Sequence, residues 1–334
     1  MRKTNIAILG AGNVGTSLAY HLGKKGHPVY MYCIEPDVEK QINKKHCNKK
    51  YLKKVKLPHN VKADSNIQTC LKDAHLIIMA VPSHVAISLI QQAKPFLQKN
   101  ATVACITKGL NSETLEPVVI SIKKHLPKDI QKHTCMIGGP AIATELTHET
   151  PTAFVVASTD KNSREFVAGL LRGGHVKVAE STDLMGVGLG AALKNPYAIS
   201  IGFCDGLHYP TNSKALIITM AVSEMAGIML RAGADPKTAP SLAGLGDLLV
   251  TGLSPHGHNR TYGEKLIKAK TNDHLKLGLS TVEGIRASEL CLKLARRLQA
   301  RTPLLEAIYR GIHSNSNYHK PFEDYLNKLK LDLI

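Results

Sequence analysis

The residues NIAILGAGNVG, at positions 5–15, decide the fold of the first half of the chain. Asn5 to Leu9 form a short apolar run that predicts a β-strand, three glycines follow it in the spacing GxGxxG, and residues 16–24 have the pattern of a helix. In this order the first glycine permits a tight turn, the second lets a pyrophosphate approach the backbone, and the third lets the helix pack closely. The sequence therefore predicts an α/β fold with a dinucleotide at this turn; a glycine-rich loop in another doubly wound fold is the alternative. The residues expected to bind the dinucleotide here are Gly10, Gly12, Asn13, Val14 and Gly15.

Further strands are predicted where short apolar runs recur, and charged residues follow two of these runs. The runs cover residues 28–34, 74–81, 102–107, 152–158 and 175–178. Glu35 follows the first run, about 20 residues after the glycines, where a carboxylate accepts both ribose hydroxyls and repels a 2′-phosphate. A carboxylate at this position predicts that the chain binds NAD and prefers NADH over NADPH. The alternative is that Glu35 only faces solvent. Lys108 follows the run at 102–107, at the sheet edge where ligands bind, and is placed to meet an anion or a carbonyl.

The pattern changes after residue 180, from strands alternating with helices to helices alone. We therefore expect an NAD-binding, Rossmann-like α/β domain over residues 1–180 and an all-α domain over residues 181–334. The chain has 334 residues, of which 43% are hydrophobic and 21% charged, as is typical of a globular protein. No stretch predicts a membrane span, and no secretion signal is expected. The seven cysteines lack CxxC spacing, which favours reduced thiols and a cytoplasmic location.

The net charge of +17 is unusual for a chain of this composition. It raises the alternative of a nucleic-acid partner, but the richest basic run, Lys40 to Lys56, contains a single tyrosine and no nucleic-acid-binding motif. We therefore expect no nucleic-acid partner and interpret the run as a solvated basic face. A positive field also raises the local concentration of a small anionic substrate.

Lys194 lies in the run GAALKNPYAISIGFCDG, residues 190–206, among small and apolar side chains. A lysine in such surroundings is costly unless a polar partner is held against it, and burial tunes lysines for acid–base work. Asn195 adds a donor and an acceptor, and Pro196 has no N–H to donate to the carbonyl of Ala192. Lys194 is therefore a candidate acid or base; the alternative is a lysine whose stem covers apolar surface while its head reaches water.

Several ordered motifs together resemble those of NAD-dependent glycerol-3-phosphate dehydrogenases over nearly the whole chain. They are the GxGxxG at 10–15, the Lys-Gly at 108–109, GGPAIATE at 138–145, ALKN at 192–195, GFCDGL at 202–207 and GLGDLLVT at 244–251. GFCDGL and the acidic residue after the second strand look closer to the eukaryotic-type, NAD-preferring enzymes. The resemblance implies a homodimer with an active site between its two domains. It also implies reversible hydride transfer between NADH and dihydroxyacetone phosphate, giving sn-glycerol 3-phosphate.

The resemblance also implies roles for single residues. Lys194 matches the catalytic lysine, and Asp247 matches the acidic residue that positions its ammonium; an ordinary surface carboxylate is the alternative for Asp247. Lys108 matches a third catalytic position, which also contacts cofactor and substrate. The remaining substrate positions are Gly139, Thr251, His258 and Asn259, and the remaining cofactor positions are Ala143, His258 and Glu283.

This chain departs from the family's pattern at several positions near the substrate. His258 replaces an arginine that precedes the asparagine, so a bidentate phosphate ligand becomes an imidazole. Arg260 is a candidate to compensate. The other departures are Gly188 for glutamate, Thr219 for arginine, Ala141 for serine or asparagine, and Pro196 for an aliphatic residue.

Two alternatives to the family's reaction follow from these departures. One is a reductase of another carbonyl substrate, such as a 2-oxo acid, and the other is an NAD-binding protein with impaired catalysis. No metal site is expected, because His256 and His258 have no evident third ligand.

Overall fold

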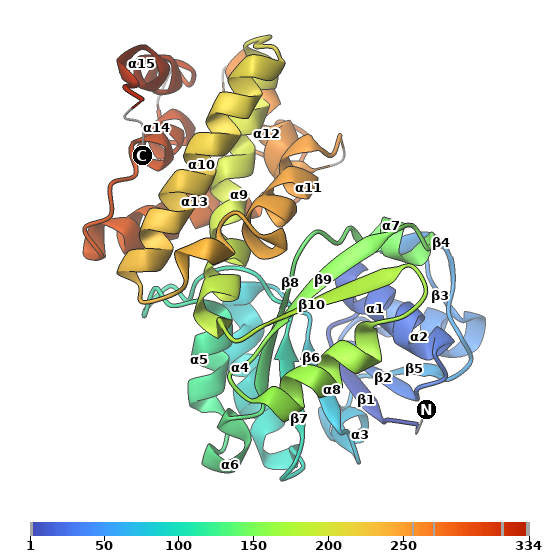
Figure 1. Cartoon of the computed structure of the whole chain (residues 1–334). Helices are drawn as coiled ribbons and strands as arrows, with labels where there is room; N and C mark the ends of the chain where they lie inside the picture. The colour runs from blue at the N-terminus through green and yellow to red at the C-terminus, as the bar shows by residue number, and fades with distance from the viewer. Residues whose placement is uncertain (1–2, 256, 270, 315–316, 332–334) are drawn as a thin grey trace. The chain divides into compact units, whose positions relative to one another are not determined.

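The computed structural model describes residues 3–255, 257–269, 271–314 and 317–331 (Figure 1). The chain forms two compact units, Met1–Gly188 and Leu189–Ile334. The division lies later than residue 180, where the strand pattern ends, because the long helix α9 (Leu184–Gly206) begins within the first unit. A Cβ built on Gly188 would lie 2.8 Å from the Cβ of Pro117, so this turn of α9 packs tightly against the first unit.

The first unit is built on an eight-stranded sheet in the order β10-β9-β8-β7-β6-β1-β2-β5. Every neighbouring pair is parallel except β8 and β9. The strands are β1 (Ile6–Leu9), β2 (Val29–Tyr32), β5 (Val61–Asp64), β6 (Leu76–Met79), β7 (Thr102–Cys105), β8 (Thr134–Gly138), β9 (Thr152–Ala157) and β10 (Val176–Ser181). Residues of β1, β6 and β7 are buried throughout, as expected for central parallel strands that are covered on both faces.

Helices cover both faces of this sheet, with α1 beside α8 and α4 beside α5 (Figure 1). They are α1 (Asn13–Lys24), α2 (Pro36–Lys45), α3 (Ile67–Leu71), α4 (Ser83–Ala93), η1 (Lys94–Phe96), α5 (Val118–His125), α6 (Lys128–Gln131), α7 (Ala143–Thr147) and α8 (Lys161–Leu171). A small antiparallel hairpin, β3 (Cys47–Asn48) with β4 (Leu52–Lys56), lies between α2 and β5 in the chain. The predicted parallel-sheet domain is confirmed.

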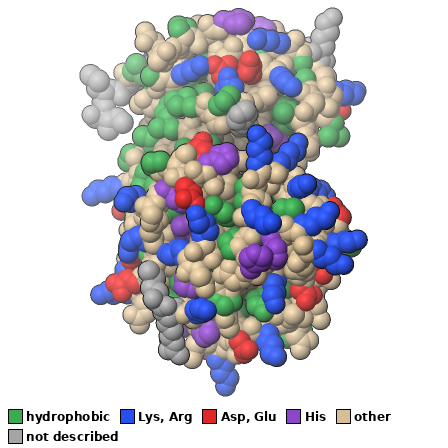
Figure 2. Space-filling view, turned by 90° about the vertical axis from the view of Figure 1, so that its right-hand side faces the viewer, with side chains coloured by type: hydrophobic (Ala, Val, Ile, Leu, Met, Phe, Trp, Pro, Cys, Tyr) green, Lys and Arg blue, Asp and Glu red, His purple; other side chains and the backbone are tan. Residues whose placement is uncertain are grey.

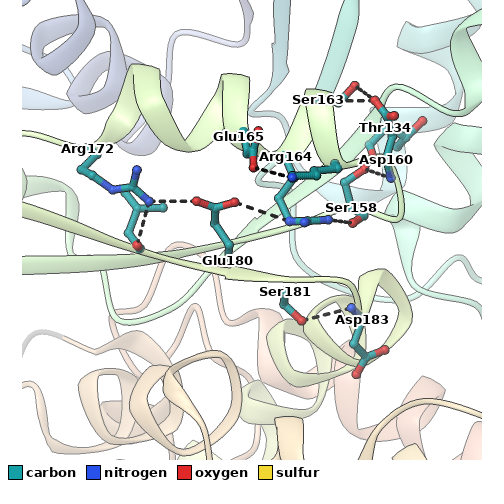
Figure 3. A network of polar contacts seen from close by, with 12 residues as sticks. Thr134, Ser158, Asp160, Ser163, Arg164, Glu165, Arg172, Glu180, Ser181 and Asp183 are labelled. Atoms are coloured by element: carbon teal, nitrogen blue, oxygen red, sulfur yellow. Dashed lines mark hydrogen bonds and ion pairs between the residues drawn. The ribbon is translucent and has the colours of Figure 1, made fainter.

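Polar contacts fix the edge strand β10 to helix α8 (Figure 3). Arg172 donates to Glu180 on β10 at 2.9 Å, and Arg164 lies 3.5 Å from the same carboxylate. Arg164 also donates to the carbonyl of Ser158 at 2.9 Å. These contacts hold together an edge strand that exposes the charged side chains of Lys177 and Glu180, and charged side chains are a common protection of edge strands.

The second unit is helical, as predicted. After α9 it contains α10 (Thr211–Arg231), η2 (Pro236–Thr238), η3 (Leu242–Gly246), α11 (Asp247–Leu253), α12 (His258–Lys268), α13 (Glu283–Arg297), α14 (Pro303–Ile312) and α15 (Lys320–Lys328). Residues 186–204 of α9 are all buried, which agrees with the even distribution of apolar residues around this helix.

Helix α10 has the length and apolar composition of a helix that could cross a membrane. Its mean hydropathy reaches 1.5 over 18 residues, although only a third of that stretch is buried inside the structure. The core helix of a globular protein passes the same test, so this single helix is weak evidence. Lys214 and Glu224 interrupt the apolar pattern. The expectation that the chain does not span a membrane stays a prediction.

Candidate active site

The turn after β1 has the geometry that a dinucleotide requires. Gly10 has φ +120°, and a Cβ there would lie 2.6 Å from the carbonyl oxygen of Ala80. A Cβ on Gly15 would overlap the carbonyl oxygen of Gly10, whereas the space beside Gly12 is open to 4 Å. Asn13 and Val14 are exposed at the start of α1. The turn therefore fits the pyrophosphate of NAD(P), with open space where the phosphates approach the backbone.

Glu35 lies three residues after the end of β2, at the N-cap of α2, and its carboxylate accepts from two donors. Tyr51 donates its hydroxyl to Glu35 Oε1 at 2.6 Å, and the Lys50 ammonium pairs with Oε2. These donors hold the pKa of the Glu35 carboxyl below its usual value, with the Lys50 contact the larger cause. The carboxylate is thus anionic at neutral pH, as recognition of ribose hydroxyls requires.

Lys108 and the turn after β8 meet around one small cavity of the first unit, with a volume of about 30 Å³. Its lining includes Val14 from α1, Lys108, and Gly139, Ala141 and Ala143 from the turn after β8. Residues that the sequence assigned to cofactor and substrate, far apart in the chain, therefore lie together at the carboxyl ends of β1, β7 and β8. That edge is where open α/β sheets bind ligands.

In the second unit, Lys194 is buried and held by two oxygen acceptors. Its Nζ lies 2.6 Å from Asp247 Oδ1 and 2.6 Å from Thr251 Oγ1. The Lys194 and Asp247 side chains are 8% and 1% exposed. Thr251 donates its own hydroxyl hydrogen to the carbonyl of Asp247 at 2.8 Å, so its oxygen is an acceptor toward the ammonium. A buried ammonium beside a carboxylate can give up and recover a proton at one fixed atom.

The backbone around Asp247 explains how that carboxylate reaches a buried lysine. The π-helical turn η3 ends at Gly246, and Asp247 is the next residue and the first of α11. A Cβ on Gly190 would lie 2.6 Å from the carbonyl oxygen of Ala243, so only a glycine lets η3 approach α9 this closely. Single π-helical turns within helical segments are frequent at functional sites.

Asn195 and Asn259 continue the polar cluster from Lys194. Asn195 donates to Glu283 Oε2 at 3.3 Å and accepts from Asn259 Nδ2 at 3.0 Å. Asn259 in turn accepts from the backbone N–H of Gly284 at 2.9 Å. The two asparagines are 3% and 6% exposed. The candidate residues Asn259 and Glu283 are therefore joined to the turn of α9 that carries Lys194 through Asn195, which the sequence had noted only as a neighbour of Lys194.

His258 and Arg260 lie at the start of α12 but have different partners. His258 is the first residue of the helix, and its Nδ1 lies 2.8 Å from the carbonyl oxygen of Thr281. Arg260 donates Nε to Asp205 at 2.7 Å and pairs with Glu264. The guanidinium is thus held by carboxylates, and the structure does not support the expectation that Arg260 replaces the missing arginine. His256 lies outside the described residues.

The similarity to known proteins extends over both units. Residues 5–164 match the family described as NAD-dependent glycerol-3-phosphate dehydrogenase N-terminus, and residues 183–323 match the corresponding C-terminus. The chain belongs to this family. A curated relative, the glycerol-3-phosphate dehydrogenase [NAD(P)+] of Bacillus subtilis, is 32% identical over 97% of this chain and 94% of its own length.

Solved structures of the family are similar along nearly the whole chain. Glycerol-3-phosphate dehydrogenase from Coxiella burnetii has a TM-score of 0.90 and 28% identity, over 98% of this chain and 99% of that chain. The Plasmodium falciparum enzyme has a TM-score of 0.87 and 24% identity, over 99% and 97%. The family and fold class expected from the motifs are confirmed. The greater likeness to eukaryotic-type enzymes stays a prediction.

The departures from the family's pattern have different structural settings. Gly188 cannot be a larger residue here, because Pro117 and Val119 fill the space a side chain would need. Thr219 lies on α10 and donates to the carbonyl of Ala215, within its own helix. Ala141 lines the cavity beside Lys108. Among the described residues no group of three or more histidine, cysteine or carboxylate side chains could hold a metal ion.

Sequence reasoning missed three residues that shape these sites: Asn48, Lys50 and Tyr51. All three belong to the lysine-rich run, which was interpreted as a solvated face. The available signal was a tyrosine and an asparagine within an otherwise basic segment, but the side chains of both form their hydrogen bonds with residues distant in the sequence. Asn48 donates to the carbonyl of Ala11 and to Thr16, each more than 30 positions away.

Proposed function

We propose that this chain is a glycerol-3-phosphate dehydrogenase that reversibly reduces dihydroxyacetone phosphate to sn-glycerol 3-phosphate. The observation that carries the proposal is the buried contact of Lys194 with Asp247 and Thr251, at 2.6 Å each. NAD(H), when bound, supplies or accepts the hydride. The first unit supports this with a glycine turn that fits a pyrophosphate and a carboxylate for ribose.

Lys194 moves the proton that accompanies the hydride. In the direction of reduction, the ammonium gives a proton from Nζ to the carbonyl oxygen of the substrate as negative charge develops there. In oxidation the neutral amine takes the hydroxyl proton back. Asp247 stays ionised and fixes the position of Nζ, and Thr251 accepts a second N–H, so the lysine keeps one geometry in both directions.

The substrate phosphate is proposed to bind at the start of α12. His258 donates its Nδ1–H to the carbonyl of Thr281, so its Nε2 donates to a phosphate oxygen only when the ring is protonated. Asn259 follows in the first turn of α12, where backbone N–H groups favour negative charge. In the first unit, Lys108 and Gly139 are the further substrate residues of the proposal.

The preferred cofactor is proposed to be NADH. The family uses NAD(P), and the finer preference rests on Glu35, whose carboxylate accepts hydroxyl groups and repels a 2′-phosphate. Besides the glycines of the turn and Glu35, the proposed cofactor residues are Asn13, Val14, Lys108, Ala143, His258 and Glu283.

We also propose a cytoplasmic homodimer without a nucleic-acid partner. All seven cysteines are free, and six of them are buried, which suits a reducing compartment. Light scattering after size-exclusion chromatography tests the dimer: a mass near 36.2 kDa, that of one chain, would contradict it.

The replacement Lys194→Met tests the proposed role of this lysine. Purified protein is mixed with NADH and dihydroxyacetone phosphate, and the loss of NADH absorbance is followed. We expect the variant to lose at least about a hundredfold in kcat, because general acid–base catalysis contributes at least this much. NADH binding, measured by fluorescence, should stay within about twofold, since Lys194 does not belong to the proposed cofactor site.

Lys265→Met is a matched control, because this lysine is also in the second unit but is exposed and donates to the carbonyl of Leu277 on the surface. Full activity of Lys194→Met would exclude the proposed mechanism. Wild-type protein that binds NADH but turns over a 2-oxo acid instead would favour the other reductase. Binding without turnover of either substrate would favour the non-catalytic protein.

A further inference from the structure

The carboxylate that selects the cofactor ribose is neutralised by a lysine from a neighbouring hairpin. We propose that Lys50 limits the preference for NADH, by compensating the charge of Glu35 and by binding the 2′-phosphate of NADPH. The inference rests on the proposed role of Glu35 in the cofactor site. It concerns a residue for which the sequence had suggested only a solvated surface.

The contact geometry supports the compensation. Glu35 is 28% exposed and Lys50 50% exposed, so both heads reach a ligand from solvent while they remain paired. Tyr51 donates to Oε1 at 2.6 Å, and Lys50 occupies Oε2. Both oxygens of the carboxylate therefore have a donor before any ribose arrives, which is unlike a carboxylate held free for two ribose hydroxyls.

The hairpin that carries Lys50 is attached to the glycine turn itself. Asn48 of β3 is 1% exposed and donates to the carbonyl of Ala11 at 2.8 Å and to Thr16 Oγ1 at 2.9 Å. Ala11 lies within the GxGxxG turn, and Thr16 is in the first turns of α1. Lys50 follows two residues after this buried anchor, so it belongs to the wall of the cofactor site and not to an independent loop.

Charge alone does not distinguish Lys50 from its neighbours. Lysine and arginine side chains greatly outnumber acidic ones on the face that includes α2 and the hairpin (Figure 2). This general field attracts NADH and NADPH alike, since both are anions. Lys50 differs because it contacts the carboxylate that meets the ribose.

NADH and NADPH would interact differently with Glu35 and Lys50. With NADH, ribose hydroxyls donate to Glu35, and Lys50 is not required. With NADPH, the 2′-phosphate would meet an uncompensated carboxylate unless the ammonium offsets it and donates to a phosphate oxygen. Removal of the Lys50 ammonium should therefore weaken the binding of NADPH and leave the binding of NADH unchanged.

The experiment compares Lys50→Met with Lys54→Met, which removes the same charge from β4 at an exposed position without a described contact to Glu35. The dissociation constants of NADH and NADPH are measured for each by fluorescence titration at 0.15 M salt. We expect Lys50→Met to raise the dissociation constant of NADPH about tenfold relative to that of NADH, which corresponds to the loss of one charge-assisted hydrogen bond. Lys54→Met should leave the ratio of the two constants unchanged. Equal ratios in Lys50→Met, Lys54→Met and wild type would overturn the proposal.

A third variant, Glu35→Gln, separates this inference from the proposed cofactor preference. In this variant the dissociation constants of NADH and NADPH should become more similar, because the carboxylate no longer repels the 2′-phosphate. If Glu35→Gln changes the ratio and Lys50→Met does not, only the role of Lys50 is refuted. If Glu35→Gln leaves the ratio unchanged, the ribose does not lie at Glu35, and both proposals are refuted.

Discussion

Glu224 is a buried carboxyl group whose titration should be visible in the stability of the protein. It lies on α10, is 8% exposed, and accepts from three donors. Tyr197 Oη, one turn after Lys194, donates at 2.8 Å, and the backbone N–H groups of Leu304 and Leu305 donate at 2.6 and 3.0 Å. Burial nevertheless raises the pKa of Glu224 from 4.5 to about 7, because desolvation outweighs these hydrogen bonds.

The direction of the effect follows from the proton count. Between pH 4.5 and 7 the folded chain retains a proton on Glu224 that the unfolded chain has lost, so rising pH lowers stability. This contribution is fully present below pH 4.5 and is lost as pH rises through about 7. One pKa unit corresponds to about 1.4 kcal/mol, so the group should contribute about 2.5 kcal/mol less at pH 8 than at pH 5.

The variant Glu224→Gln removes this titration while keeping an acceptor for the N–H groups at the start of α14. Urea unfolding followed by circular dichroism at 222 nm gives the free energy of unfolding at pH 5, 6, 7 and 8. From pH 5 to pH 8 the free energy of unfolding of the wild type should fall by about 2.5 kcal/mol relative to that of the variant. The other titrating groups are the same in both proteins, so their contributions cancel.

Glu289→Gln is the control, because Glu289 is exposed and its pKa lies below the usual value, owing chiefly to Lys293. Its difference from wild type should stay constant over the same range. A constant difference for Glu224→Gln, within about 0.5 kcal/mol, would refute the argument that Glu224 is protonated in the folded chain near neutral pH.

Two further replacements test the phosphate and cofactor sites. His258→Arg should lower the KM for dihydroxyacetone phosphate by about tenfold in steady-state assays, because a guanidinium binds phosphate through two charge-assisted hydrogen bonds; an unchanged or higher KM would argue against phosphate at this position. Gly15→Ala forces a methyl group into the carbonyl of Gly10 and should destabilise the chain by about 1–3 kcal/mol and weaken NADH binding. A thermal unfolding curve and NADH affinity equal to wild type would show that the turn relaxes and that close packing at Gly15 is not required.

Three strands of the sheet that are buried at every position, β1, β6 and β7, were predictable from the sequence. Such strands are continuous apolar runs, and β1, β6 and β7 were expected at nearly their observed positions. β8 (Thr134–Gly138) was not predicted, although it too is buried at every position. The hairpin and β5 were also not predicted, and these two share a physical reason. β4 (LKKVK) and β5 (VKAD) are short and bury only alternate or single positions, so their apolar signal is weak. Their pairing depends on neighbours that the local sequence does not contain.

The candidate site was predictable in its members more than in its contacts. Lys194 was expected from an ionisable group within an apolar run, and its burial agrees with that argument. Its partner Asp247 is 53 positions away, and Glu283, the partner of Asn195, is 88 positions away. These contacts depend on how α11 and α13 pack against α9, which periodicity does not specify. The resemblance named the residues, but the acceptor role of Thr251 and the link through Asn195 required the structure.

The buried pair of Lys194 and Asp247 is difficult to explain as a stabilising feature. Taking two charges out of water costs several kcal/mol per ion, and replacement of such a pair by apolar residues is often neutral or stabilising. The surroundings would accept apolar residues, because α9 is buried along residues 186–204 and is otherwise rich in small and aliphatic side chains. The chain instead places an ammonium, a carboxylate and a hydroxyl within 2.6 Å contacts there, with glycine at position 190 to admit the segment that precedes the carboxylate. The proton transfer that we propose for Lys194 needs one lysine held in a single geometry, whereas folding does not, and this arrangement supports the proposal.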